Sequence, residues 1–287
     1  MTDRPLVGVF LTHANDLLGP DLARLGEVAR RLDDAGVDYL TVADHIVLGS
    51  DLSAHDALGG ALGYPLTEPY PEPLVTLAAI AAVTTRIRLM TGVLVAPLRP
   101  PALLAKSVAT LALLSAGRLE LGVGSGWHDA EFAALGVPIA EKVARLDAGL
   151  ATCRALWRDE SCTGLHCYPQ PPGGTVPVWF AGKPTRATLR RVVDTGAGWL
   201  PIRQLDPEAA ATARADLDRA CDEAGRDPAT VGIRCPLAPI DDWGALRDTV
   251  ARLWESGVDG VHLPLRRLAT SLSELDAVLP RLTGLAA

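Results

Sequence analysis

Residues 86–127, RIRLMTGVLVAPLRPPALLAKSVATLALLSAGRLELGVGSGW, contain the clearest secondary-structure pattern of this 287-residue chain. Two apolar runs rich in β-forming residues, 87–95 and 118–123, stand on either side of a run with helical spacing, 102–114. Apolar side chains of the helical run recur so that they form one stripe: Leu103, Leu104, Val108, Leu111 and Leu114. A strand, a helix and a second strand in this order predict a right-handed parallel crossover unit.

The rest of the chain repeats this alternation. Further strand-like runs stand at 6–11, 39–43, 177–181, 198–201, 230–235 and 259–263, and further helical runs at 21–35, 74–83, 128–135, 140–157, 185–193, 207–224, 243–255 and 273–282. Eight strands that alternate with helices predict an α/β fold, a closed (β/α)8 TIM barrel rather than an open doubly wound sheet. We expect a single domain over residues 1–287. Insertions are expected after the second strand, at 46–73, and around the fourth to fifth strands, at 161–175.

Composition narrows the classes of function. The chain is 48% hydrophobic and carries a net charge of −7, which argues against a nucleic-acid or membrane-surface binder because both need basic patches. We expect no membrane span and no secretion leader, and therefore a cytoplasmic protein. Its 5 cysteines lack the CxxC spacing of a zinc site, so we expect reduced structural thiols and no metal.

Barrel enzymes carry their chemistry on the loops that follow the strands, so the candidate site residues stand there. They are Asp44 and His45; Thr91, Gly92 and Val93; Gly124, Ser125, Gly126, Trp127 and His128; and Gly182, Lys183, Pro184 and Thr185. His13, at the end of the first strand, and Tyr64 and Tyr70, in the 46–73 loop, are expected to line the substrate space. The alternatives for these three are a surface or capping histidine and a loose surface loop.

Each segment has a chemical interpretation and a plain structural one. The imidazole of His45 can donate a hydrogen bond or move a proton at neutral pH, or else Asp44 caps the following turn and His45 packs on it. Gly92 marks either a bulge with close backbone approach or a core glycine. The glycine-rich turn at 124–126 lets the backbone approach a planar ligand, although turns of this kind are common in βα units.

The segment 182–185 places a glycine, a lysine, a proline and a hydroxyl at a predicted helix start, which suits a phosphate group. Arg186 and Arg190 follow on the same helix. A local basic cluster in an acidic protein favours an anionic ligand, whereas an ordinary turn with solvated charges is the alternative. The spacing of a P-loop is absent.

The 86–127 segment, the Asp44-His45 pair and the 179–199 segment together resemble the luciferase-like oxidoreductases, in particular their coenzyme F420 branch. The resemblance implies a (β/α)8 barrel that binds a flavin or deazaflavin at the carboxyl ends of its strands. It further implies that Asp44 and His45 contact the cofactor ring and the substrate.

In the resembling enzymes a non-prolyl cis peptide at the position of 91–93 supports the cofactor ring, and the segment matching 182–185 holds its phosphate. Many relatives carry asparagine where His128 stands, and some carry glutamate where Trp127 stands. The catalytic acid or base is therefore open among Asp44, His45 and His128.

The sequence favours an F420-dependent oxidoreductase that transfers a hydride to or from a small organic substrate. An FMN-dependent monooxygenase supplied by a separate reductase is the first alternative. A barrel lyase or isomerase, which would use the 182–185 site for a phosphorylated substrate, and an inactive cofactor-binding relative are the others. The expected partners are the substrate, a reductase for the flavin or F420, and a second copy of the chain in a homodimer.

Overall fold

The structure is a computed structural model that describes residues 3–11, 14–19, 21–53, 66–67, 69–159, 164–238 and 242–286. Its strands are β1 (Leu6–Phe10), β2 (Tyr39–Val42), β3 (Arg88–Thr91), β4 (Leu94–Val95), β5 (Leu119–Gly124), β6 (Val178–Ala181), β7 (Gly198–Leu200), β8 (Gly232–Pro236) and β9 (Gly260–Pro264). They pair in parallel in the order β3-β2-β1-β9-β8-β7-β6-β5-β4, and a further pairing of β3 with β5 closes the ring. The predicted (β/α)8 barrel is therefore confirmed.

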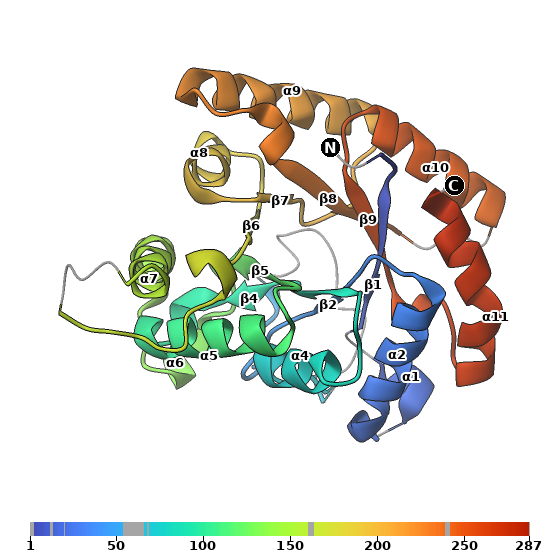
Figure 1. Ribbon diagram of the computed structural model, residues 1–287, viewed down its shortest axis with the longest axis horizontal. Helices are drawn as coiled ribbons and strands as arrows, with labels where there is room; N and C mark the ends of the chain where they lie inside the picture. The colour runs from blue at the N-terminus through green and yellow to red at the C-terminus, as the bar shows by residue number, and fades with distance from the viewer. Residues whose placement is uncertain are drawn as a thin grey trace.

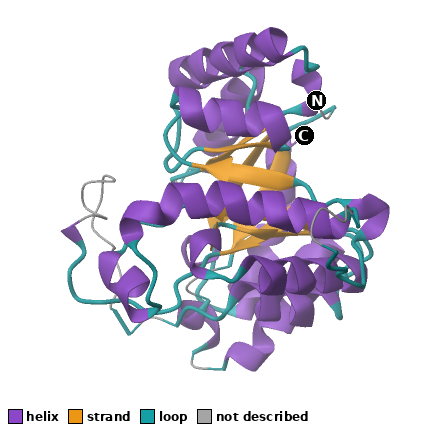
Figure 2. Ribbon diagram, turned by 90° about the vertical axis from the view of Figure 1, so that its left-hand side faces the viewer, coloured by secondary structure: helices purple, strands orange, loops and turns teal. Residues whose placement is uncertain are grey.

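The helices lie around the outside of this ring (Figure 1, Figure 2). They are α1 (Asn15–Leu18), α2 (Leu25–Ala35), α4 (Pro73–Ala81), α5 (Pro101–Leu114), α6 (Asp129–Ala134), α7 (Lys142–Trp157), α8 (Arg186–Thr195), α9 (Pro207–Ala224), α10 (Trp243–Glu255) and α11 (Leu272–Thr283). Several of their ends follow capping chemistry. Asp206 accepts a hydrogen bond from the Ala209 amide at the start of α9, and glycines in the left-handed region, Gly36 and Gly225, end α2 and α9. No described helix is long and apolar enough to cross a bilayer.

Three element predictions need correction. The strand expected at 87–95 is two strands, β3 and β4, separated at Gly92 and Val93, whose peptide bond is cis. The helix expected at 21–35 begins with a 3-10 turn, Leu22–Arg24, before α2. The helix expected from residue 128 starts at Asp129, because His128 is extended.

The apolar stripe predicted on α5 is also partly wrong. Leu104, Val108 and Leu111 are buried, but Leu103 and Leu114 are exposed. The buried face is completed instead by three alanines, Ala105, Ala109 and Ala112. Small side chains let the helix lie close to its neighbours, so its buried face is set by packing rather than by the largest apolar residues.

The amino-terminal half of the barrel interior is filled by a cluster of aromatic and charged side chains. The guanidinium of Arg234 on β8 lies 4.6 Å from the ring centre of Tyr39 and 4.2 Å from that of Trp179. Arg234 also pairs with the buried carboxylate of Glu120 on β5, which Arg88 contacts at 2.7 Å. Burial alone would raise the pKa of Glu120, but Arg234 and Arg88 hold it below its ordinary value.

Glycines on neighbouring strands make room for this cluster. A Cβ atom added at Gly8 would lie 2.5 Å from the Tyr39 ring, and one at Gly198 would lie 2.2 Å from the Trp179 ring. Both distances are shorter than a van der Waals contact. The filled interior confines any ligand to the carboxyl-terminal half of the barrel, where barrel enzymes bind their substrates.

Candidate active site

The carboxyl-terminal half of the barrel is open to a ligand. Several residues at this end are partly exposed: Phe10, Ala181, Pro236 and Pro264 at the last positions of their strands, and Gly92 between β3 and β4. Apolar walls of this kind, with a few polar groups, are typical of a small-molecule site. The candidate residues that follow β2, β5 and β6 lie at this end of the barrel, and their roles in a site stay predictions.

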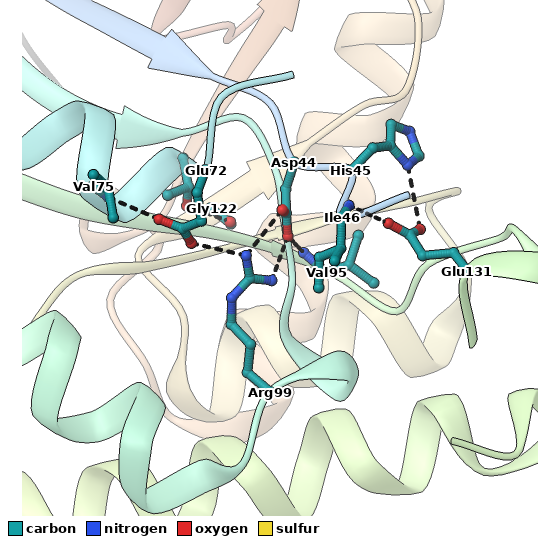
Figure 3. A network of polar contacts seen from close by, with 10 residues as sticks. Asp44, His45, Ile46, Glu72, Val75, Val95, Arg99, Gly122 and Glu131 are labelled. Carbon is teal, nitrogen blue, oxygen red and sulfur yellow. Dashed lines mark hydrogen bonds and ion pairs between the residues drawn. The ribbon is translucent and has the colours of Figure 1, made fainter. Parts of the chain in front are cut away.

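Asp44, two residues beyond the end of β2, forms hydrogen bonds with other residues of the chain through both carboxylate oxygens. Its Oδ2 accepts hydrogen bonds from the Val95 amide at 2.8 Å and from Arg99 Nη1 at 2.5 Å, and its Oδ1 accepts one from Arg99 Nη2 at 2.9 Å. Arg99 also reaches Glu72, at 2.9 Å (Figure 3). The Asp44 contacts tie the end of β2 to β4 and to the loop before α5.

The next side chain, His45, points away from this network toward α6 (Figure 3). Its Nδ1 lies 3.3 Å from Oε2 of Glu131, whose other oxygen accepts a hydrogen bond from the Ile46 amide at 2.6 Å. A carboxylate only accepts hydrogen bonds, so the proton of a neutral His45 belongs on Nδ1 and Nε2 keeps a lone pair. Nε2 has no hydrogen-bond partner among the described residues.

Two aromatic rings enclose the same imidazole. Tyr70 and Trp127 meet it edge to face, with ring centres 5.0 Å and 5.5 Å away. Tyr70 thus lies beside His45, and its role in lining the substrate space stays a prediction. His13 and Tyr64, the other two predicted lining residues, lie outside the described part of the chain.

His128 is buried, and it fixes the loop that follows β2. Its Nε2 accepts a hydrogen bond from the Gly49 amide at 2.6 Å, so this nitrogen carries no proton here. A Cβ at Gly49 would lie 2.8 Å from the Cβ of Ala130, which is why the loop can approach α6 only with glycine at this point. His128 therefore has a clear structural role, and its catalytic role stays a prediction.

The glycine-rich turn after β5 packs closely on β4. Gly126 has a φ of +80°, and a Cβ there would lie 2.7 Å from both Phe132 and Val95. Ser125 and Trp127, on either side of it, are partly exposed. A Cβ at Gly124 would lie 3.0 Å from the side chain of Val93. The turn thus brings its backbone against β4 and leaves these two side chains at the opening.

The segment between β3 and β4 forms part of the same surface. Thr91 is fully buried and donates a hydrogen bond to the Gly122 carbonyl of β5 at 2.6 Å. Gly92 and Val93 are partly exposed, and a Cβ at Gly92 would lie 2.8 Å from that of Thr41. Thr91 therefore holds the strand ends together, while Gly92 and Val93 can contact a ligand.

The loop after β6 carries exposed cations. Neither Lys183 nor Arg186 forms an ion pair within the part of the chain that the structure describes. Thr185 caps α8 by accepting a hydrogen bond from the Thr188 amide at 3.2 Å. Gly182, Lys183 and Pro184 line a pocket of about 770 Å³, together with the β7–α9 connection and α9. A helix start that carries such basic side chains suits a phosphate group.

Sequence reasoning missed Glu131 and Arg99. Glu131 stands in the first turn of α6, where an acidic residue is also explained by the helix dipole. Arg99 stands between prolines in a loop and shows no local pattern. Only the fold brings Glu131 to His45, 86 residues away, and Arg99 to Asp44, 55 residues away.

Together these features define a (β/α)8-barrel enzyme with a histidine held by a carboxylate after β2 and a basic helix start after β6. The chain belongs to the luciferase-like monooxygenase family, whose sequence model matches residues 6–276. It is therefore an enzyme of a family of oxidoreductases and monooxygenases.

A curated relative from Mycobacterium tuberculosis (strain ATCC 25177 / H37Ra), a phthiodiolone/phenolphthiodiolone dimycocerosates ketoreductase, is 31% identical over 247 residues, which cover 78% of this chain and 64% of the relative. An F420-dependent secondary alcohol dehydrogenase, solved with an F420–acetone adduct, has the same fold at a TM-score of 0.72 and 17% identity, covering 99% of this chain and 100% of the other. The oxygenating constituent of 3,6-diketocamphane monooxygenase from Pseudomonas putida, solved with FMN, gives a TM-score of 0.74 at 14% identity, covering 99% and 98%.

Proposed function

We propose that the chain is an F420-dependent oxidoreductase that transfers a hydride between the deazaflavin and a small substrate with a carbonyl or secondary alcohol group. The observation that carries this proposal is the arrangement of His45, with Nδ1 on the buried Glu131 carboxylate and Nε2 without a partner among the described residues at the opening of the barrel. The three relatives described above, by their names, act on ketones or secondary alcohols. The ketoreductase is related to this chain in sequence, and the other two share its fold.

The residues present fit a flavin or a deazaflavin. Both cofactors carry a planar ring and a phosphate, and the chain offers a partly exposed surface at Gly92 and Val93 and exposed cations at Lys183 and Arg186. The glycines at 124 and 126 keep the turn after β5 close to that surface. We assign the phosphate to the start of α8, where Lys183 and the first amides of the helix would hold it.

A bound cofactor would supply the hydride chemistry. The chain supplies the proton chemistry. During alcohol oxidation His45 Nε2 takes the proton of the substrate hydroxyl, and during carbonyl reduction it returns that proton to the oxygen. The Glu131 carboxylate orients the imidazole and stabilises its protonated form, while Tyr70 and Trp127 shield it from water. Asp44, with both oxygens occupied, positions Val95 and the adjacent backbone rather than touching substrate.

An FMN-dependent monooxygenase is the second candidate, and the likeness to the Pseudomonas putida enzyme favours it. Such an enzyme would receive reduced flavin from a separate reductase. Membership of a redox family argues against the lyase or isomerase alternative. The cytoplasmic location, the single-domain organisation and the homodimer stay predictions.

The two candidates are separated by turnover. The protein is mixed with F420 and a panel of secondary alcohols, and reduction is followed by the loss of deazaflavin absorbance. In parallel it is mixed with reduced FMN, oxygen and ketones, and oxygenated product is measured. The proposal expects deazaflavin reduction with at least one alcohol. Oxygenated product with FMN, and no reduction of F420, would replace it by the second candidate.

A further inference from the structure

A second histidine, His262, lies in the barrel interior and takes no part in the chemistry proposed above. It belongs to β9 and pairs in register with Gly8 of β1 and with Pro236 of β8. Its strand neighbours Val261 and Leu263 are 1% exposed, whereas His262 is partly exposed. The ring therefore borders the open half of the barrel, one inward-facing position below the rim.

The phenol of Tyr39 determines which nitrogen of His262 carries a proton. The Tyr39 oxygen lies 3.3 Å from Nδ1, and no other acceptor for its proton stands among the described residues. Tyr39 is completely buried, and burial raises its pKa, so the phenol keeps its proton and acts as the donor. Nδ1 must then accept, and the proton of the neutral imidazole belongs on Nε2.

The imidazole stays neutral under physiological conditions. Burial, and then the nearby Arg234 guanidinium, lower the pKa of His262 to about 4. A neutral ring whose Nδ1 is occupied offers a single group to a ligand, the Nε2 proton. Within the part of the chain that the structure describes, Nε2 has no hydrogen-bond partner.

Apolar side chains lie beside the His262 ring. Phe10 on β1 has its ring centre 6.4 Å from that of His262, and Pro236 and Pro264 are the partly exposed neighbours on β8 and β9. A hydrogen-bond donor among apolar side chains favours a ligand that places an acceptor atom opposite it. A ligand without such an atom would leave the donor unpaired and away from water, which costs binding free energy.

We propose that His262 donates a hydrogen bond from Nε2 to a carbonyl oxygen of the ligand in the open half of the barrel, and that Tyr39 is the positioning residue that fixes this tautomer. This inference rests on the proposed function, because it takes the ligand to be either the cofactor or the substrate. Both contain carbonyl oxygens, the cofactor on the edge of its ring and the substrate at the reacting carbon. His262 would act as a donor only, whereas His45 moves the proton.

The direct test is nuclear magnetic resonance of the full chain with ¹⁵N-labelled histidine. Comparison with His262→Gln assigns the His262 signals, and the exposed His166 serves as a control ring in the same spectra. We expect wild-type His262 to be protonated at Nε2 and unchanged between pH 6 and 8. In Tyr39→Phe we expect a mixture of the two tautomers, which a purely structural tyrosine would not produce. A wild-type ring protonated at Nδ1 would overturn the proposal.

The same spectra recorded with added ligands then identify the molecule that carries the acceptor oxygen. A shift of the Nε2–H signal on adding F420 or FMN assigns it to the cofactor ring, and a shift with cyclohexanone alone assigns it to the substrate. His262→Gln should weaken binding of the responsible ligand by roughly five- to twenty-fold, and His166→Gln should not. No shift with any of the three compounds, in protein that binds cofactor by fluorescence, would overturn the role of His262. Absence of cofactor binding itself would count against the proposed function, and the cyclohexanone arm would still test His262.

Discussion

Replacing Asp44 by asparagine tests whether this residue supports the site or acts in it. The substitution keeps the shape of the side chain and removes its charge. The Asp44 side chain is 1% exposed and that of Arg99 is 12% exposed, so the pair is largely shielded from water. Breaking a buried pair by removing one partner costs about 3–5 kcal/mol, because the other charge is left without compensation.

Two features reduce this cost. Arg99 keeps its contact with Glu72, whose side chain is 42% exposed, and exposed pairs contribute only about 0.2–1 kcal/mol. The introduced amide would also still accept one hydrogen bond from the Val95 amide or from Arg99. We therefore expect Asp44→Asn to lower the free energy of unfolding by about 2–4 kcal/mol.

The assay is urea unfolding followed by tryptophan fluorescence, with Glu72→Gln as the matched control. The control removes the exposed partner of the same arginine and should cost less than about 1 kcal/mol. Folded Asp44→Asn protein should keep a large share of its turnover. An unchanged unfolding midpoint with a loss of turnover of 100-fold or more, roughly the effect of removing a general base, would refute this reasoning and make Asp44 a catalytic residue.

Three further predictions address the two histidines and the basic loop. His45→Ala should lower turnover by roughly 10²–10⁴-fold in steady-state assays and change cofactor affinity little; unchanged turnover would leave His128 as the next candidate. Lys183→Ala should weaken cofactor binding by about 1–3 kcal/mol in low-salt titrations, and less in high salt; an equal dissociation constant at low salt would assign Lys183 to a solvated turn. His262 has a folded pKa of about 4, below the value of roughly 6.5 for an unfolded histidine, so the unfolded state binds its proton first as the pH falls. Stability should therefore drop between pH 6.5 and 4, and His262→Gln should make that drop shallower in urea unfolding; equal pH dependence in both proteins would contradict a ring that is neutral in the folded protein.

The barrel could be predicted from the sequence because its signals are local. Apolar runs, helical spacing and glycine or proline at element ends each extend over a few residues, and their alternation was enough to identify the barrel. The break at Gly92 had a local signal too, the glycine itself, but its effect on the strand depends on how β4 meets β5. The apolar stripe predicted on α5 was partly wrong because alanines, rather than Leu103 and Leu114, complete the buried face of the helix.

The candidate site was predictable only in part. The loops that carry His45, His128 and Lys183 follow from the strand ends. The partners of the histidines do not, because they come from elsewhere in the chain: Glu131 meets His45 across 86 residues of sequence, and Tyr39 meets His262 across 223. Strand register and barrel closure decide such contacts, and single-sequence periodicity does not contain them.

Titration of the same protein with F420 and with FMN tests the central claim most directly. Both titrations are followed by cofactor fluorescence at low salt, with Lys183→Ala as the comparison. We predict a lower dissociation constant for F420 than for FMN, and weaker binding of F420 by the variant. Micromolar binding of FMN with no detectable binding of F420 would overturn the choice of cofactor. Binding of neither, by folded protein, would contradict the claim that this chain is a deazaflavin- or flavin-dependent oxidoreductase.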